Sequence, residues 1–229
     1  MEVIPGLHAI DLGIVYAYLY QEADKVSIFD SGMETHAERI LGEVAALGRR
    51  PEDIRQIVVS HHHPDHAGSL AELAERSGAS VLAHELDAPV VRGEVEGPPP
   101  ILPDAEKEVF ERIAADVPPL RPAHVDRELA DGDEVDLDGG AQVVHVPGHT
   151  AGSIALYLPK RRLLLCGDAA VCDPEGRLIV GVFNVDTEQA RQSFRKLAEL
   201  DFEVACFGHG APLDKEASFA FRRLAEKLG

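Results

Sequence analysis

The stretch Ser60-His61-His62-His63-Pro64-Asp65-His66 decides how this sequence is interpreted, because it holds the spaced pattern His61-x-His63-x-Asp65-His66. In an extended segment, side chains two residues apart point the same way, so His61 and His63 can share one metal ion. Asp65 and His66 follow the turn that begins at Pro64 and face a second position. The alternative is a polar surface turn or a set of helix-capping side chains. Such a four-residue match is expected by chance only about two times in a thousand, so the pattern predicts a metal site.

The histidine-rich loop lies between a predicted strand and a predicted helix. Residues 54–59 form a β-rich apolar run, and Leu70, Leu73 and Ala74 then fall at helical spacing until Gly78 ends the pattern. The loop is therefore at the carboxyl end of a strand. In sheets flanked by helices, this edge is where ligands bind, because its loops can vary while the sheet stays rigid.

The rest of the chain alternates strand and helix patterns, which predicts the α/β class. Further strands are predicted at 14–20, 26–29, 142–146, 154–158, 162–166 and 204–207, and helices at 37–48, at 187–200 and after Asp214 as an N-cap. The segments occur in similar order in the two halves, which suggests a duplicated sandwich. We expect residues 1–229 to form one domain, since a chain of 229 residues with 45% hydrophobic content can bury one substantial core.

A proline-rich segment at residues 93–123 interrupts this alternation. It carries Pro98, Pro99, Pro100, Pro103, Pro118, Pro119 and Pro122 around a short predicted helix at 104–115. Such a segment cannot be core sheet, because proline lacks the backbone donor that a central strand needs. We expect an insertion that is either a surface connection or a flap over the substrate.

Three further positions share one local pattern, in which an apolar strand is followed by glycine and then a metal-capable side chain. They are Gly148-His149, Gly167-Asp168 and Gly208-His209. Each dipeptide alone is an ordinary turn. Their common placement at strand ends makes His149, Asp168 and His209 candidate ligands.

In chain order, these residues resemble the pattern of the metallo-β-lactamase superfamily, His-x-His-x-Asp-His followed by a separate His, an Asp and a final His. The resemblance covers nearly the whole chain, since the Asp30-Ser31-Gly32 turn is also similar to a strand-end element of that family. The runs Ser-His-His-His-Pro-Asp-His-Ala-Gly and Pro-Gly-His-Thr-Ala-Gly-Ser are most similar to the glyoxalase II group. The resemblance implies a four-layer αββα sandwich.

The resemblance also implies a role for each ligand. His61, His63 and His149 would bind one zinc ion, Asp65, His66 and His209 would bind a second, and Asp168 would bridge the two. The ligand types suit zinc, although Mn²⁺ or Fe²⁺ is also possible. A water between two such ions is acidified to a hydroxide nucleophile, while an open metal position polarises a carbonyl. We therefore expect a dinuclear zinc hydrolase acting on an ester, thioester or lactone.

Two carboxylates are expected to assist. Asp65 can orient the nucleophile or pass its proton to the leaving group, so it is the candidate catalytic residue. Asp30 is expected to support a ligating histidine through the ring nitrogen that faces away from the metal. The other histidines are expected to be surface or packing residues. They are His8, His36, His62, His84, His124 and His145.

The charge and the apolar content of the chain disfavour some classes of binding partner. The formal net charge of −18 and the pI near 4.9 disfavour nucleic acid and anionic membranes. No long apolar run or signal-peptide layout occurs, so we expect a cytoplasmic protein that acts on a small molecule. Cys166, Cys172 and Cys206 lack paired spacing, which disfavours a disulfide framework and a zinc knuckle, and the two that lie in apolar strands are expected to be packing residues.

The resemblance does not settle the substrate. Glyoxalase II enzymes hold glutathione with a C-terminal region, whereas this sequence ends soon after His209. Acyl-homoserine lactonases of the superfamily place tyrosine three residues after the bridging aspartate, where this chain has Val171. Neither the substrate nor the oligomeric state follows from the sequence.

Three other functions compete with hydrolysis of a carbonyl substrate. They are a mononuclear iron persulfide dioxygenase, a metal-dependent phosphodiesterase and a metal-binding protein without catalysis. The acidic surface disfavours the second, and the complete set of seven ligands disfavours the third.

Overall fold

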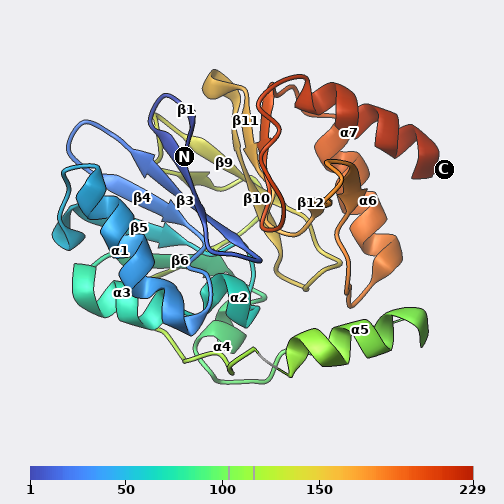
Figure 1. Cartoon of the computed structure of the whole chain (residues 1–229), viewed down its shortest axis with the longest axis horizontal. Helices are drawn as coiled ribbons and strands as arrows, with labels where there is room; N and C mark the ends of the chain where they lie inside the picture. Colours follow the sequence, from blue (N-terminus) through green and yellow to red (C-terminus); the bar gives the residue numbers. More distant parts are fainter. Residues whose placement is uncertain (103, 116, 229) are drawn as a thin grey trace.

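The computed structural model describes residues 1–102, 104–115 and 117–228, and it is a four-layer sandwich (Figure 1). Two sheets pack face to face in the middle, and helices cover the outer face of each sheet. This is the αββα arrangement expected of an α/β chain with a repeated strand and helix order.

The first sheet has seven strands in the order β1-β2-β3-β4-β5-β6-β7. Strands β1 to β4 pair antiparallel, and β4 to β7 pair parallel. The strands are β1 (Glu2–Ile4), β2 (Leu7–Asp11), β3 (Tyr16–Gln21), β4 (Val26–Phe29), β5 (Ile54–Val58), β6 (Ser80–His84) and β7 (Arg127–Leu129).

The second sheet has five strands in the order β14-β11-β10-β9-β8, in which only the β11–β14 pair is parallel. A separate two-stranded ribbon, β12 and β13, follows β11. The strands are β8 (Glu134–Val135), β9 (Ala141–His145), β10 (Ile154–Leu158), β11 (Leu163–Leu165), β12 (Ala170–Cys172), β13 (Leu178–Val180) and β14 (Val204–Cys206).

Helices form the two outer layers. The α-helices are α1 (Ala37–Ala46), α2 (Pro64–Ala67), α3 (Leu70–Ser77), α4 (Ala88–Val91), α5 (Asp104–Ala114), α6 (Thr187–Ala198) and α7 (Ala217–Ala225). Short 3₁₀ turns are η1 (Glu34–His36), η2 (Pro51–Asp53), η3 (Pro159–Arg161) and η4 (Glu226–Leu228). Helices α1 and α3 cover the first sheet, α6 and α7 cover the second, and α5 lies apart from both pairs (Figure 1).

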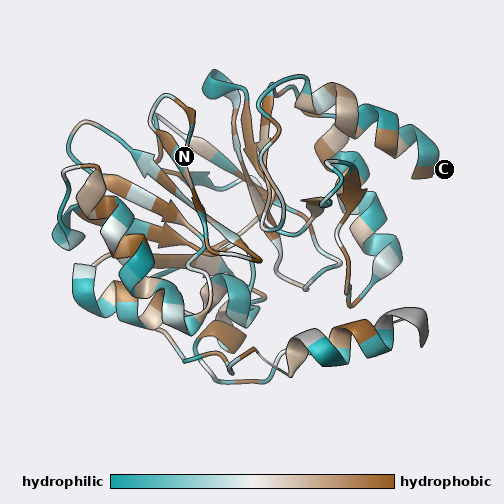
Figure 2. Cartoon of the chain, viewed as in Figure 1, coloured by the Kyte–Doolittle hydropathy of each residue, from teal (hydrophilic) through white to brown (hydrophobic). Residues whose placement is uncertain are grey.

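Alternation along the strands divides the core into three layers. In β3, Ala17 and Leu19 pack toward α1 and α3, while Tyr18 and Tyr20 pack between the sheets. In β11, Leu163 and Leu165 pack between the sheets and Leu164 packs under α6 and α7. Because side chains alternate faces in a strand, a strand buried on both faces must be apolar throughout. Figure 2 shows this hydrophobic character in the central strands.

Two predicted boundaries were wrong. Residues 14 and 15 belong to a loop, and the strand begins at Tyr16. The last helix begins at Ala217 after Glu216, which has φ 52° and makes no side-chain cap, so Asp214 is not its N-cap. The predicted helices at 70–78 and 187–200 are confirmed as α3 and α6.

Within the described residues, segment 93–123 contains helix α5 and no strand, as its prolines predict. The prolines at 98, 99, 100, 118, 119 and 122 lie in irregular backbone, and Pro103 lies outside the described residues. Among the helices described here, none has the length and apolar content needed to span a bilayer.

The three cysteines are free and buried, as expected of packing residues. Burial raises the pKa of the Cys166 thiol well above its ordinary value. The thiol therefore stays protonated and unreactive at neutral pH.

Candidate metal centre

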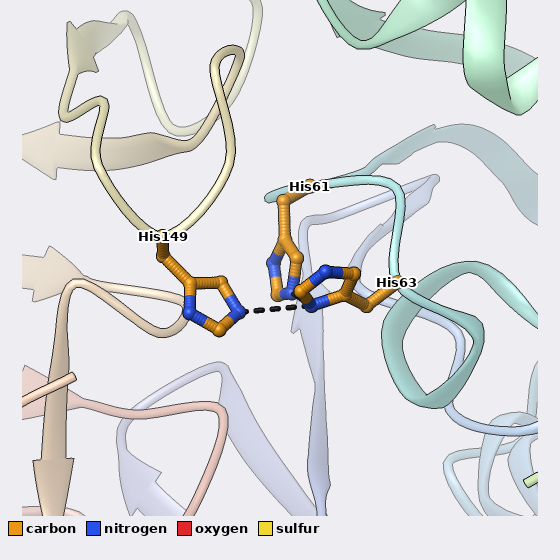
Figure 3. A group of neighbouring side chains, drawn as sticks. All are labelled: His61, His63 and His149. Atoms are coloured by element: carbon orange, nitrogen blue, oxygen red, sulfur yellow. Dashed lines mark hydrogen bonds between the residues drawn. The ribbon is translucent and has the colours of Figure 1, made fainter. Parts of the chain in front are cut away.

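The seven candidate ligands gather at one edge of the sandwich, although they come from both sheets. Four follow β5 of the first sheet in the histidine-rich loop, and the other three follow β9, β11 and β14 of the second. The carboxyl end of β5 in the first sheet thus lies close to the carboxyl ends of β9, β11 and β14 in the second sheet. Figure 3 shows His61 and His63 reaching toward His149 from the opposite side.

Local sequence explains the shape of the histidine-rich loop. His63 has extended backbone (φ −63°, ψ 146°) and makes no side-chain cap, so its ring is free to turn into the site. Pro64 occupies the first turn of α2, where its missing N–H costs nothing. That turn brings Asp65 next to His209, while the His66 ring stays beside the His61 ring, with centroids 4.1 Å apart. The helix-capping alternative for this stretch is therefore wrong for His63.

The first group is His61, His63 and His149 (Figure 3). His61 Nε2 lies 3.1 Å from His63 Nδ1, and His149 Nε2 lies 2.9 Å from that same atom. Three imidazole nitrogens thus converge on one point. Ligands at the usual zinc–nitrogen distance in a tetrahedron would lie about 3.4 Å apart, only slightly farther than these atoms.

The second group is Asp65, His66 and His209. His209 Nε2 lies 3.3 Å from Asp65 Oδ2, and His66 Nε2 lies 3.6 Å from it. These distances suit three donors around one ion. The set mixes imidazole and carboxylate, whereas the first group is all imidazole.

Asp168 lies between the two groups. Its Oδ1 is 3.3 Å from His66 Nε2, and its Oδ2 is 3.2 Å from His209 Nε2. The same Oδ2 is 3.6 Å from His149 Nε2 in the first group. The carboxylate is therefore within reach of both positions.

Glycines before the later ligands are required by close packing. Gly148 has φ +130°, and a Cβ there would collide with the backbone of Ala190 at the start of α6. Gly167 has φ +52°, and its Cβ would meet Ser60 Cβ at 2.6 Å. A Cβ on Gly208 would overlap Asp168 Oδ1. The repeated glycine and ligand pattern in the sequence thus marks places where backbone passes against the site.

The outer nitrogens of the ligand rings are held by fixed acceptors. His149 Nδ1 donates to the carbonyl of Val182 at 2.9 Å, and His209 Nδ1 donates to that of Ile14 at 2.5 Å. His66 Nδ1 contacts Asp30 Oδ2 at 3.0 Å. Such bonds set which ring nitrogen is left for a metal.

Asp30 lies beneath the histidine-rich loop, as expected for a supporting carboxylate. It is 1% exposed, has φ 63°, and accepts the Ser60 amide at 2.7 Å and the Ser60 hydroxyl at 2.8 Å. The Ser60 hydroxyl in turn contacts His61 Nδ1 at 2.9 Å. Asp30 therefore orients His66 directly and His61 through Ser60.

The histidines of the site fall into two kinds, those with a lowered pKa and those with a raised pKa. Burial, with neighbouring imidazoles, lowers the pKa of His61 and His63 well below the ordinary value, and burial also lowers that of His149. For His209, burial acts to lower the pKa, but the Asp168 and Asp65 carboxylates raise it to about 10. The first group is thus neutral in the metal-free chain.

The second group is an ion-paired cluster in the metal-free chain. Burial acts against the charged form of His66, but Asp168, Asp65 and Asp30 hold its pKa well above the ordinary value. Burial likewise acts to raise the pKa of Asp168, and His209 and His66 bring it well below.

Two buried atoms indicate that the cluster fits a metal. His66 Nε2 and Asp168 Oδ1 make no hydrogen bond although both are inaccessible to solvent. The two atoms lie 3.3 Å apart as an ion pair without a hydrogen bond, and a bound cation would satisfy both. The donor set of nitrogen and carboxylate oxygen is one that Zn²⁺ accepts.

The structure also brings in a residue that the sequence did not single out. Asp87, in the turn between β6 and α4, is 2% exposed and contacts His62 Nδ1 at 2.9 Å. His62 belongs to none of the metal-capable groups, although its ring lies edge to face with that of His63 at 5.0 Å, and it is a buried partner of this carboxylate. Among the described residues, none of His8, His36, His84, His124 and His145 falls in a metal-capable group.

Comparison with known proteins agrees with this architecture. The family model described as the metallo-beta-lactamase superfamily matches residues 10–209. A probable metallo-hydrolase, YflN of Bacillus subtilis, is 29% identical over 93% of this chain and 86% of its own length. Hydroxyacylglutathione hydrolases of Ruegeria pomeroyi and Cereibacter sphaeroides are 32% and 34% identical over 85% and 72% of this chain. The chain spans only 62% and 51% of those two relatives.

Solved structures give the same result. A metallo-β-lactamase family protein of Thermus thermophilus superposes with a TM-score of 0.71 at 27% identity, over 99% of this chain and 79% of that one. A metallo-β-lactamase of Cronobacter sakazakii with a HARLDQ motif gives 0.70 at 27% identity, over 92% and 77%. The family model matches most of the chain, and the αββα sandwich carries a His/Asp cluster at the edge where its two sheets meet. This chain therefore belongs to the metallo-β-lactamase superfamily.

Proposed function

We propose that this chain is a hydrolase that binds two zinc ions and cleaves a carboxylic ester, thioester or lactone. The observation that carries the proposal is the convergence of seven side chains into two outer groups of three donors, joined by a third group of His61, His66 and Asp168. His61, His63 and His149 would hold the first ion. Asp65, His66 and His209 would hold the second, and Asp168 would contact both.

Zinc at these positions supplies Lewis acidity to a carbonyl and lowers the pKa of water. The chain's own residues supply the rest. Asp65 has a side chain 20% exposed, so it can take a proton from attacking water and deliver it to the leaving oxygen or sulfur. Val182, Ile14 and Asp30 keep the ligand rings oriented through the reaction.

The surroundings of the site support an apolar, uncharged acyl group. Ile14 and Val182, whose carbonyls hold two ligand rings, have side chains that are 53% and 39% exposed. Ile101 of the proline-rich segment is 74% exposed, and its amide donates to the Asn184 carbonyl at 3.0 Å. Segment 93–123 is thus tied to the loop that holds Val182, which places it near the site as either a surface connection or a substrate flap.

Cationic side chains do not contact the ligands. Over the part of the chain that the structure describes, no hydrogen bond or ion pair of the seven ligands involves lysine or arginine. A substrate with a carboxylate next to the scissile bond would find no lysine or arginine held against the ligands. Neutral acyl groups are therefore the favoured class.

The test is to strip metal from the protein with a chelator, reload it with zinc, manganese or iron, and assay thioesters, lactones, aryl esters, β-lactams and phosphodiesters. We expect zinc to restore hydrolysis of carbonyl substrates. His149→Ala should remove this activity, whereas His124→Ala, at an exposed histidine outside the site, should keep it. Hydrolysis that survives chelation would overturn the proposal, as would activity confined to iron-dependent oxidation or to phosphodiesters.

A further inference from the structure

Asp87 is bonded to both loops that supply the first ligand group. Its Oδ2 accepts the His62 amide at 3.0 Å and the Thr150 hydroxyl at 2.8 Å, and its Oδ1 accepts the Gly152 amide at 2.7 Å. His62 lies between the ligands His61 and His63. Thr150 directly follows the ligand His149.

The carboxylate is held in its charged form inside the protein. Burial acts to raise the pKa of Asp87, but the hydrogen bonds from His62 and Thr150 bring it below its ordinary value. Hydrogen bonds to an ionised group are shorter and about twice as strong as neutral ones. Asp87 therefore ties together two loops: the one that holds His62, 25 residues before it, and the one that holds Thr150 and Gly152, 63 and 65 residues after it.

Two glycines let the backbone close around this tie. A Cβ on Gly152 would lie 2.6 Å from the amide nitrogen and Oδ1 of Asp87. A Cβ on Gly97, in the proline-rich segment, would collide with His62 Nε2. One loop is thus packed against the carboxylate and the proline-rich segment against its partner His62, which leaves little room for either to shift.

We propose that Asp87 is a positioning residue that holds the His61–His63 loop and the His149–Gly152 loop at the separation that the first metal ion needs. The inference rests on the proposed function, because it assumes that the first group binds a metal. Asp87 contacts no ligand ring; its partners are His62, between two ligands of the first group, and Thr150 and Gly152, just after the third. It should therefore act on the first ion and leave the second nearly unaffected.

The test measures zinc affinity at one position at a time by competition with a coloured chelator. A His209→Ala background leaves the first group intact, and a His149→Ala background leaves the second. We expect Asp87→Ala to weaken zinc binding about 10- to 100-fold in the first background. In the second background the change should be under about threefold.

Conservative variants separate positioning from general support. Asp87→Asn keeps one acceptor oxygen and should recover part of the lost affinity. Asp126→Ala is the matched control, because Asp126 also accepts a backbone amide from another segment, that of Val81 at 2.8 Å, but lies outside the ligand loops. It should leave both affinities unchanged. If Asp87→Ala does not fold, Thr150→Val removes one of the same hydrogen bonds and should show a smaller first-position loss.

A second readout uses the metal-free protein. Hydrogen exchange at the His62 and Gly152 amides should speed up at least tenfold in Asp87→Ala while α6 and α7 stay protected. Equal affinity losses at both positions, or unchanged amide exchange, would overturn the inference. If wild-type protein bound zinc but hydrolysed nothing, the proposed function would fail while the affinity and exchange tests of Asp87 remained decisive.

Discussion

Zinc binding should release protons from one half of the site and none from the other. In the metal-free chain, the three imidazoles of the first group have lowered pKa values and are neutral at pH 7.5. His66 and His209 have raised pKa values, about 10 for His209, and keep their protons. A metal ligand must be deprotonated, so filling the second position should displace about two protons from side chains.

The sign of the pH dependence follows from that count. Between pH 7 and pH 9, raising the pH removes protons that compete with the second ion, so its apparent affinity should rise by up to about 100-fold per pH unit. The first position should change little over that range, because its imidazoles are already neutral. Acid should weaken the first position only below the ordinary histidine pKa, near 6.5.

Titration calorimetry in two buffers of different ionisation enthalpy counts the protons directly. The His209→Ala variant reports the first position and the His149→Ala variant the second. Two protons released by the first position and none by the second would refute the assignment of charge in the site.

The remaining predictions concern single variants and substrates. Asp168→Asn keeps the shape of the side chain but removes the negative charge that offsets the repulsion between two dications about 3.5–4 Å apart. The variant should therefore bind about one ion and lose most activity. Metal analysis and circular dichroism on one sample decide this, and two retained ions with near wild-type turnover would contradict it. The double variant His61→Ala with His149→Ala should lack the first ion, whereas His62→Ala should still bind two at saturating zinc, because Asp87 keeps the backbone tie; full zinc loading of the double variant, measured by elemental analysis, would refute the ligand set. For a series of straight-chain thioesters, kcat/KM should rise up to about fourfold per added methylene, and Val182→Asp should flatten the rise; a preference for short or anionic acyl groups would count against the proposed apolar acyl group.

The sequence brought out all seven candidate ligands because their signal is local, and their role as metal ligands stays a prediction. His61, His63, Asp65 and His66 lie within six residues, and each later ligand follows a glycine that the structure shows to be needed. The αββα layers followed from the family resemblance, and alternating apolar residues in strands such as β3 account for them physically.

What the sequence missed depends on contacts between distant segments. Asp87 is a lone aspartate in an ordinary turn, and nothing nearby indicates that its partners are His62, Thr150 and Gly152. Ile14 was assigned to a strand because it is apolar, yet it lies in a loop and its carbonyl holds His209. Asp214 matches a cap by residue type, but the αL backbone of Glu216 starts the helix instead.

The division of the site between the two sheets has a mechanical consequence. The histidine-rich loop is attached to the first sheet, while His149, Asp168 and His209 are attached to the second. Sliding one sheet across the other would therefore change the spacing of both ligand groups at once. The Tyr18 hydroxyl resists such shear, because it donates to the Phe207 carbonyl at 2.8 Å and accepts the Phe207 amide at 3.1 Å, two residues before His209. Mutations in the inter-sheet packing, far from any reacting atom, should thus change the distances between the candidate ligands and weaken metal binding.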